Sequence, residues 1–446
     1  MNTLAQRYNW SDLTADERCS VLQRPALATN ATTVADVRQI LAEVQTGGDA
    51  TLRQLTEKLD GVRLDSFRVS EAEFTAARNA LSKEQITALG MAINNVTRFH
   101  EAQLSDAKTV ETAPGVLCER ITRPIPAVGL YVPAGTAPLP STAIMLAIPS
   151  RIAGCPVRIL CSPPRTDGTA DPAVLVAATK CGITAVFKLG GAQAIAAMAY
   201  GTETVPKVDK VFGPGNAWVT AAKTEVARNP AGAAMDMPAG PTEVLVIADA
   251  AADPRAVALD LLSQAEHGID SQVILVTNST ALADATDTEI QAALLTLPRR
   301  DIMEQSLQHS RILFTADIAE AVSVSNAYAP EHLIMQVTNA RSWLDQIINA
   351  GSVFLGPFTP EAVGDYCSGT NHVLPTYGYA RAYSGLSVFD FQKRISVQEL
   401  TAEGVRLLQP TVSVLARMEG LDAHARAVEV RVERLNEQTG QTGLNP

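Results

Sequence analysis

Histidine is rare in this chain, and most of its histidines stand beside other residues that could bind a metal or transfer a proton. The 446 residues include six histidines. Four of them lie in surroundings rich in Gly, Pro or acidic residues: His267, His332, His372 and His424. An imidazole is a common metal ligand, and its reference pKa near 6.5 makes it a competent base at neutral pH. These four positions are therefore the first candidates for a site.

The first candidate lies in the segment SQAEHGID. Asp253 is typical of a helix N-cap, and we expect a helix from Pro254 to His267. On such a helix Gln264 and His267 are about 60° apart and share a face, whereas Glu266 is about 160° from Gln264 and points away. Gln264 and His267 are thus candidate ligands. For a lone histidine, binding to the last carbonyl groups of the helix is the favoured interpretation, and the strong zinc motif HExxH does not occur.

Two further pairs combine a carboxylate with an imidazole. In GDYCSGTNHVLPT, after an expected strand, Asp365 and His372 lie in the kind of loop where α/β proteins bind ligands, although Asp365 could simply form an Asx-turn. In APEHL, Glu331 and His332 precede a strand. Neighbours on a strand face opposite sides, so both serve one site only if the chain bends at Pro330. The alternative is an ordinary surface pair.

The last pair is Glu419 and His424 in EGLDAH, which we expect in a turn that enters the final helix. Cys367 suggests a thiol nucleophile, but the sequence places no basic neighbour beside it to lower its pKa, so we assign it no role.

Two series of alternating strands and helices must position these residues. The first runs from about residue 125 through strands at 157–160, 185–190 and 209–212. The second has strands at 243–248, 272–277, 311–316, 333–337 and 352–356. Such alternation is typical of parallel sheets covered by helices, so we predict two α/β sheet domains, one inserted in the other. After them come charged amphipathic helices, in which Val428, Val432 and Leu435 form one apolar stripe.

Composition narrows the functional classes. A net charge of −11 with no Lys/Arg cluster argues against nucleic acid as a partner. The longest apolar run, at 142–149, is far too short to span a membrane, so we expect no membrane partner. The six cysteines are scattered without CxxC spacing, and the N-terminus has no targeting character. We therefore expect a cytoplasmic protein with reduced thiols.

Phosphate-binding signals are weak. No GxGxxG occurs, and the nearest segment, GPGNAW at 213–218, has Trp218 in place of the third glycine. Helices that begin after glycines, at 190–194 and 213–217, could hold an anion at their N-termini. A nucleotide is compatible with these segments but is not identified by them.

Taken in order, eight segments resemble the histidinol dehydrogenase family, zinc enzymes that complete histidine biosynthesis. They cover most of the chain from about residue 120 onward: YVPAGTAPLPST, LGGAQAIAA, VFGPGNAWVTAAK, DMPAGPTEVLVIAD, LLSQAEHG, APEHL, GDYCSGTNHVLPT and EGLDAHARAV. At the matching positions the resemblance implies zinc ligands Gln264, His267, Asp365 and, from the other subunit, His424. It implies His332 as the proton acceptor and Glu331 as the acid–base residue acting on water. Other implied contacts are to substrate (Thr242, His372, Glu419) and to NAD (Tyr131, Gln193, Asn216).

The resemblance also implies a reaction and an assembly. L-Histidinol would be oxidised through L-histidinaldehyde to L-histidine, with one NAD⁺ reduced at each step, in a homodimer that shares its active sites. Zinc would hold the substrate through its imidazole and amino nitrogens, and manganese or cobalt could replace it. The implied fold has two incomplete Rossmann-like domains, with small terminal pieces that interlock two subunits. We expect an N-terminal dimerisation segment at 1–23, one domain from 24–130 and 244–386, a second at 131–243, and a C-terminal helical dimerisation domain at 387–446.

Two residues depart from the family pattern: Thr242 stands where we expect serine, and Cys367 where we expect a small residue such as alanine. The first keeps the hydroxyl group but adds a methyl group beside it. Other functions stay open at this stage: a paralogous zinc dehydrogenase of another small amino alcohol, a metal hydrolase, or a silent nucleotide-binding scaffold.

Overall fold

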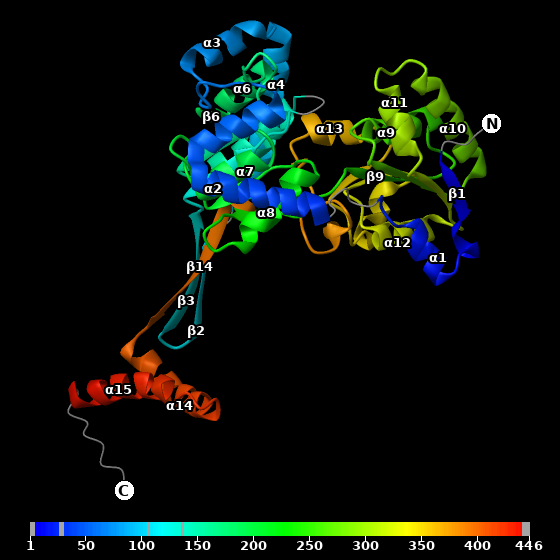
Figure 1. Ribbon diagram of the computed structural model, residues 1–446. Coiled ribbons are helices and arrows are strands. Elements are labelled where there is room, and N and C mark those ends of the chain that lie inside the picture. The colour runs from blue at the N-terminus through cyan, green and yellow to red at the C-terminus, as the bar shows by residue number, and fades with distance from the viewer. Residues whose placement is uncertain (1–4, 26–30, 105–106, 135–137, 439–446) are drawn as a thin grey trace. The chain divides into compact units, whose positions relative to one another are not determined.

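Two parallel sheets carry the apolar core of the larger part of the chain (Figure 1). The computed structural model describes residues 5–25, 31–104, 107–134 and 138–438. The chain divides into two compact units: Met1–Gln103 with Ile125–Phe391, and Leu104–Pro124 with Gln392–Pro446. Both parallel sheets belong to the first unit. This agrees with the predicted pair of Rossmann-like α/β domains.

The first sheet has six parallel strands in the order β1-β11-β10-β9-β12-β13. Their bounds are β1 Gln6–Asn9, β9 Glu243–Ala248, β10 Gln272–Thr277, β11 Arg311–Phe314, β12 His332–Gln336 and β13 Ser352–Leu355. Successive side chains of a strand point to opposite faces. Accordingly Val244 and Val246 face one core, while Leu245 and Ile247 face the other.

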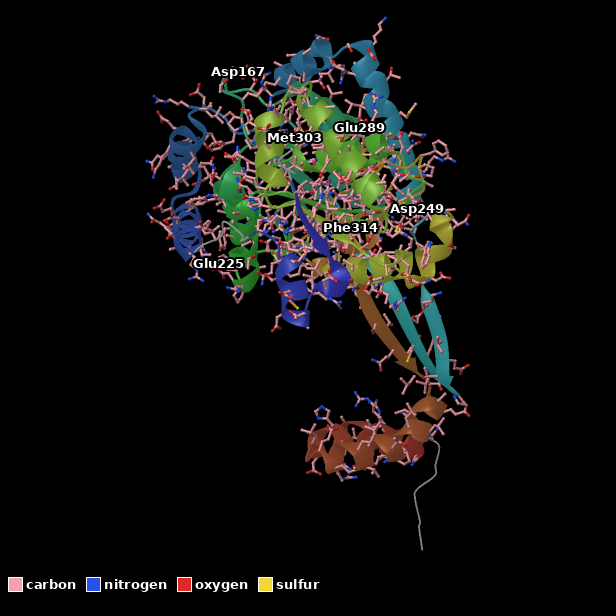
Figure 2. The ribbon with its side chains drawn as sticks, turned by 90° about the vertical axis from the view of Figure 1, so that its right-hand side faces the viewer. Asp167, Glu225, Asp249, Glu289, Met303 and Phe314 are labelled. Carbon is pink, nitrogen blue, oxygen red and sulfur yellow. The ribbon has the colours of Figure 1, made fainter. Side chains whose placement is uncertain are left out.

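Helices cover both faces of this sheet. On one side lie α9 (Pro254–Ala265), α10 (Thr280–Leu294) and α11 (Arg300–Leu307), and Met303 of α11, labelled in Figure 2, is fully buried in that core. On the other side lie α1 (Ala15–Val21) and α12 (Ile318–Tyr328). The strand β9 is buried at all six positions, as its continuous apolar run EVLVIA predicts for the centre of a covered parallel sheet.

The second sheet has five parallel strands in the order β6-β5-β4-β7-β8 and lies, in sequence, between β1 and β9. Its strands are β4 Ala127–Tyr131, β5 Val157–Ser162, β6 Ala185–Lys188, β7 Lys210–Phe212 and β8 Ala234–Met235. The helices that follow these strands are α5 Pro140–Ile152, α6 Pro172–Lys180, α7 Gly191–Tyr200 and α8 Ala217–Arg228. One sheet is thus inserted in the other, as the two series predict.

Three long N-terminal helices pack on this second sheet. They are α2 (Ala31–Asp60), α3 (Glu71–Ala80) and α4 (Lys83–Glu101), and their apolar residues share cores with α5 to α8. The sequence predicts that residues 24–130 form one domain with residues 244–386, whereas these helices bury their apolar faces against the five-stranded sheet. Likewise β1 of the expected terminal segment 1–23 is an edge strand of the six-stranded sheet.

The second unit contains an antiparallel sheet as well as helices. Strands β2 (Lys108–Ala113), β3 (Val116–Pro124) and β14 (Gln392–Leu400) pair in the order β14-β3-β2, followed by α14 (Ala402–Met418) and α15 (Asp422–Gln438). The expectation of a purely helical segment at 387–446 is therefore wrong for its first part. Residues 392–400 form a strand because they pair with β3 in an antiparallel sheet, and the local sequence pattern does not predict this pairing.

Most predicted elements of the two series occur within one or two residues of their predicted ends, and β9 and β10 match exactly. Between β12 and β13 the chain forms a 3₁₀ helix, Ala340–Gln346. All six cysteines are free thiols. Among the described residues, no helix is both long and apolar enough to cross a membrane.

Candidate functional site

A cavity of about 160 Å³ brings together most of the candidate residues of the first unit. Its walls come from the start of β9 and β12, the end of α9, the loop after β7, and the segment around α13 (Glu361–Tyr366). The candidates that line it are Thr242, Gln264, His267, Glu331, His332, Asp365 and His372. Residues far apart in sequence therefore meet at the amino ends of two central strands of the six-stranded sheet.

Gln264 and His267 lie at the end of α9, as the helical spacing predicts. The α-helix ends at Ala265, and the N–H of His267 donates to the carbonyl of Gln264 at 3.2 Å. Gln264 is 1% exposed, whereas His267 is exposed, and both line the cavity. Glu266 is the C-cap residue and is not among the lining residues that the structure describes.

Glu331 and His332 reach the same cavity because the chain bends just before them. Ala329 takes a left-handed conformation (φ 57°) and is followed by Pro330, so Glu331 precedes β12 and escapes the alternation of a strand. The peptide N–H groups of Gly351 and Ser352 donate to the carbonyls of Pro330 and Glu331 at 2.9 and 2.8 Å. This is the bend that the sequence required for both side chains to share one site.

The ring of His332 has a fixed hydrogen-bonding pattern. Its Nδ1 lies 3.2 Å from the carbonyl oxygen of Glu243. A carbonyl oxygen only accepts, so Nδ1 carries the proton and Nε2 is left as an acceptor. Burial lowers the pKa of His332 to about 3, and its Nε2 is a buried atom without a hydrogen-bond partner. The neutral ring therefore presents a free lone pair, which is what a proton acceptor needs.

The carboxyl group of Glu331 is buried and held by several donors. Burial raises its pKa well above the usual range, while hydrogen bonds from Thr242 and from the N–H of Glu243 oppose that shift. The N–H of Glu243 donates to Oε2 at 3.0 Å. A carboxyl group with a raised pKa can give as well as take a proton near neutral pH, which suits an acid–base residue.

Thr242 links two other candidates. Its Oγ1 lies 2.6 Å from Oε2 of Glu331 and also makes a hydrogen bond with the side-chain amide of Gln264. In the alternative orientation of the amide, Gln264 Nε2 donates to Glu361, at 2.7 Å for Oε2, and Gln264 Oε1 faces the Thr242 hydroxyl group, whose one proton serves either this oxygen or Glu331. Besides any contact with substrate, Thr242 thus orients protein groups.

Glu361 is a member of this cluster that the sequence analysis did not select. It lies in α13, one helical turn before Asp365, and is 1% exposed. The ligand atoms of His267, Glu361 and Asp365 all lie within 4.8 Å of one another. The (i, i+4) spacing of the two acids could have indicated that they share one face of a helix, but the segment around Asp365 was expected to be a loop. Asp365 itself lies in α13 and not in a loop.

The charges of this cluster suit a bound cation. Burial raises the pKa of Asp365 to about 7 and that of Glu361 well above the usual range. Among the described residues, the basic side chain within 4.0 Å of either carboxylate is His332, which is neutral. Buried carboxylates without a cationic partner are costly unless a metal ion compensates them. Imidazole nitrogen with carboxylate and amide oxygens is a donor set compatible with zinc, manganese or cobalt.

His372 faces the same cavity. Burial lowers its pKa to about 4, and its Nε2 is a second buried atom without a hydrogen-bond partner in the described structure. The neighbouring Asn371 is tied to the core through a 2.8 Å hydrogen bond to the carbonyl of Met145. The His372 ring is therefore able to bind a polar group of a ligand in the cavity.

The three candidates for the nicotinamide cofactor lie on the five-stranded sheet. Asn216 is the N-cap of α8 and lines a second cavity of about 470 Å³, which shares Thr242 and His267 with the first. Tyr131 and Gln193 are buried, at 3% and 2% exposure. Tyr131 Oη accepts from the N–H of Gly191 at 3.0 Å.

Gln193 contacts a residue that the sequence analysis did not select. Its Nε2 donates to Asp60 Oδ2 at 3.1 Å, and burial raises the pKa of that carboxyl group. Of the three cofactor candidates, the described cavities reach Asn216 alone.

Glu419 and His424 belong to the second unit. Glu419 is the C-cap of α14, and His424 lies in the first turn of α15 with its side chain exposed. These two residues therefore belong to a different unit from the seven candidates that line the first cavity.

Comparison with known proteins identifies the family to which the chain is similar. The family model described as histidinol dehydrogenase matches residues 22–432. Histidinol dehydrogenase of Xanthomonas campestris pv. campestris is 56% identical over 432 residues, covering 97% of this chain and 99% of the relative. That of Photobacterium profundum is 54% identical and covers 96% of both chains.

The crystal structure of histidinol dehydrogenase from Elizabethkingia anophelis matches the fold with a TM-score of 0.94. It is 45% identical in sequence, and the match covers 98% of this chain and all of that one.

Proposed function

Since the chain belongs to the histidinol dehydrogenase family, an NAD-linked oxidoreductase acting on L-histidinol, we propose that the cavity around Glu331 and His332 is its catalytic site. The observation that supports this proposal most directly is the hydrogen bonding of the His332 ring. Its tautomer is fixed by Glu243, and its buried Nε2 is an acceptor without a partner, facing the cavity.

The proposed chemistry uses this one acceptor twice. His332 Nε2 takes the hydroxyl proton of L-histidinol while the carbinol hydrogen leaves as hydride to NAD⁺, which gives the aldehyde and NADH. Glu331 then removes a proton from water as the water adds to the aldehyde carbon, and the proton held by His332 passes to the former carbonyl oxygen, which gives the hydrate and returns His332 to its neutral form. The hydrate loses a second hydride to another NAD⁺ while His332 again takes the hydroxyl proton, which gives L-histidine.

A zinc ion is part of this proposal. The residues that would hold it are Gln264, His267 and Asp365, together with His424 of the partner subunit, while Glu361 holds the Gln264 amide. When bound, zinc supplies positive charge and coordination positions that fix and polarise the substrate. The uncompensated carboxylates of Asp365 and Glu361 support this assignment.

The remaining contacts follow from position and from the family. We assign Thr242, His372 and the partner subunit's Glu419 to the substrate, and Tyr131, Gln193 and Asn216 to NAD. The unpartnered Nε2 of His372 in the first cavity and the place of Asn216 beside the second cavity support two of these assignments. The assignment of His424 and Glu419 requires a homodimer with shared sites, and we also propose a cytoplasmic location.

An assay of NAD⁺ reduction with L-histidinol, before and after chelation, tests the proposal. We expect two NADH for each histidinol consumed, loss of activity on chelation, and recovery on addition of zinc. Turnover without NAD⁺ would instead point to a metal hydrolase. Faster oxidation of another small amino alcohol would revive the paralogue alternative, which the named relatives do not favour.

A further inference from the structure

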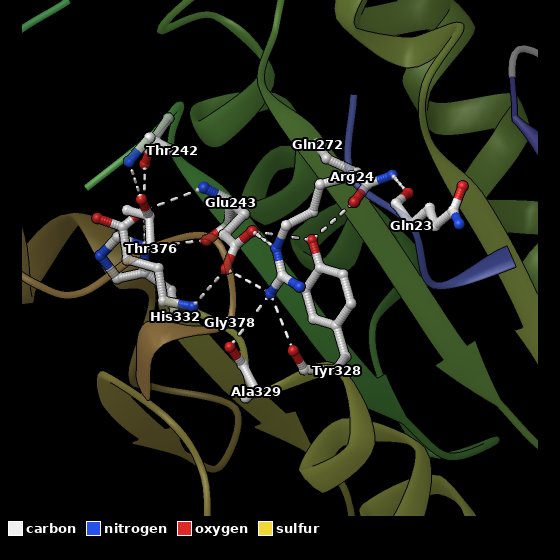
Figure 3. Close-up of polar contacts among 12 residues, drawn as sticks. Gln23, Arg24, Thr242, Glu243, Gln272, Tyr328, Ala329, His332, Thr376 and Gly378 are labelled. Atoms are coloured by element: carbon white, nitrogen blue, oxygen red, sulfur yellow. Dashed lines mark hydrogen bonds and ion pairs between the residues drawn. The ribbon is translucent and has the colours of Figure 1, made fainter. Parts of the chain in front are cut away.

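An arginine of the N-terminal segment reaches a buried glutamate next to the catalytic pair (Figure 3). Arg24 Nη2 donates to Glu243 Oε1 at 2.8 Å, and its Nε makes a second hydrogen bond to Oε2. The Glu243 side chain is 2% exposed and that of Arg24 10%. A planar guanidinium that meets a carboxylate with two parallel hydrogen bonds gives a strong and directional contact.

Glu243 touches both catalytic residues through different atoms. Its N–H donates to Glu331 Oε2 at 3.0 Å, and its carbonyl accepts from His332 Nδ1 at 3.2 Å. Its Oε1 also accepts from the N–H of Glu331 at 3.3 Å. One residue therefore orients the acid–base carboxyl group and sets the tautomer of the base.

Arg24 also holds the bend that delivers this pair. Its Nη2 donates to the carbonyls of Tyr328 and Ala329 at 2.9 and 3.2 Å, and its guanidinium lies 3.9 Å from the centre of the Tyr328 ring. Ala329 has a positive φ, a conformation that costs a non-glycine residue free energy and persists only where its surroundings enforce it. Arg24 is thus fixed to the backbone immediately before Glu331 as well as to Glu243.

The far end of the cluster anchors it to the rest of the sheet. Tyr328 Oη lies 2.8 Å from Gln272 Oε1 and 3.1 Å from Glu243 Oε2, while Gln272 Nε2 donates to the carbonyls of Gln23 and His309. These contacts connect the Arg24–Glu243 pair to β10 and to the end of α12.

We propose that Arg24 is a positioning residue for catalysis: its bonds to the Glu243 carboxylate and the Ala329 bend hold Glu331 and His332 in their working geometry. The inference rests on the catalytic roles proposed above and gives the N-terminal segment a part in the chemistry. Lysine cannot replace arginine here, because a single ammonium group cannot reproduce the planar fork that binds the carboxylate and the two carbonyls together.

The test compares Arg24→Lys with Arg18→Lys in the full-length, zinc-loaded protein. Arg18 is a matched control, since it lies in the same segment, stacks on Trp10 at 5.0 Å and donates to the Trp10 carbonyl, but makes no contact with Glu243. Misplacement of a reacting group by about 1 Å can cost about 100-fold in rate. We therefore expect Arg24→Lys to lower kcat of both oxidations by about 10- to 100-fold. The KM for histidinol and the zinc content should stay as in the wild type, and Arg18→Lys should leave kcat unchanged.

Chemical rescue separates positioning from a general loss of stability. In Arg24→Ala, added guanidinium ion at millimolar concentration should restore part of kcat, and added methylammonium should not. Glu243→Gln, which keeps the shape but removes the charge, should lower kcat in the same pattern as Arg24→Lys.

Each contrary result is decisive. Equal kcat in Arg24→Lys and wild type would overturn the positioning role, and so would equal losses in the Arg24 and Arg18 variants. Failure of both Arg24→Lys and Glu243→Gln to fold would show that the pair serves stability alone. A wild-type protein that makes no NADH from histidinol would instead reject the proposed function.

Discussion

Oγ1 of Thr242 and Oε2 of Glu331 lie 2.6 Å apart and are joined by a hydrogen bond. The same hydroxyl group contacts the Gln264 amide, so a residue expected to touch substrate also connects the acid–base residue with a proposed metal ligand. The methyl group by which threonine differs from serine leaves both of these contacts intact.

Replacement of Thr242 by valine should slow the oxidation of the aldehyde. Valine keeps the shape but removes the hydroxyl group, and a buried polar group that loses its partner costs about 1–3 kcal/mol, which corresponds to about 10-fold or more in rate. Thr242→Ser is the control and should stay close to wild type. The initial rate of NADH formation from histidinaldehyde measures the effect, and an unimpaired valine variant would contradict it.

His332 and Glu331 should separate the two half-reactions. His332→Asn should slow both oxidations, because the same Nε2 takes the proton in each, and loss of a general base typically costs about 100- to 10,000-fold. Glu331→Gln should slow chiefly the step from aldehyde to acid, so that histidinol yields nearly one NADH before turnover stalls. Equal losses in both half-reactions for Glu331→Gln would rule out this division of roles.

Glu361→Gln should weaken zinc binding although Glu361 is not among the four proposed ligands. The substitution removes a buried charge and replaces one of the two oxygens that accept from the Gln264 amide by a donor, and loss of such an outer partner typically costs about 10- to 100-fold in metal affinity. The rate of zinc transfer to a chromogenic chelator measures the effect without any activity assay. Glu266→Gln, at the adjacent C-cap of α9, is the control and should release zinc as the wild type does.

Asp260→Asn should stabilise the protein at neutral pH. Burial raises the pKa of Asp260 to about 6, with an opposing hydrogen bond from Gln336. Between about pH 4 and pH 6 the folded state therefore binds more protons at this group than the unfolded state, so stability falls as pH rises through this window, by about 2–3 kcal/mol. Asparagine keeps the acceptor without the charge.

Unfolding by denaturant at several pH values from 4 to 8 measures this effect. We expect the Asp260→Asn variant and the wild type to coincide near pH 4, to diverge between about pH 4 and pH 6, and to differ by a constant amount above pH 6. A variant less stable than wild type at pH 8 would contradict the prediction.

Mixing two inactive variants tests the shared site. His267→Asn damages the ligand set of its own subunit, and His424→Asn damages the set of the partner. In a mixed dimer one site receives both substitutions and the other none. Refolding the variants together should therefore restore about a quarter of wild-type activity, because half of the dimers are mixed and half of their sites are intact. No recovery, with mixed dimers present, would place His424 in its own subunit's site.

Sequence patterns predicted those parts of the molecule that local physics determines. The strands β9 and β10 are buried on both faces, so their apolar runs mark their ends exactly. The helical spacing predicted that Gln264 and His267 share one face of α9 and that Glu266 points away from it. A bend before Glu331 was expected if Glu331 and His332 were to share one site, but the left-handed backbone of Ala329 was not predicted.

The features that were missed depend on partners distant in the sequence. β1, with the polar sequence QRYN, is a strand only because β11 offers an edge to pair with. Glu361 became a site residue through burial beside Gln264, and its (i, i+4) spacing to Asp365 indicates a shared helix face but not that burial. Arg24 and Asp60 likewise gained their roles from contacts with Glu243 and Gln193.

The pairing of β1 with β11 has a consequence for synthesis on the ribosome. Gln6 pairs with Arg311, and β13 completes the same sheet only after Leu355 has been added. The five-stranded sheet, complete by Met235, can form while the rest of the chain is still being made, since nascent domains fold in order of their emergence. The first strand to leave the ribosome must therefore wait unpaired while most of the polypeptide follows it.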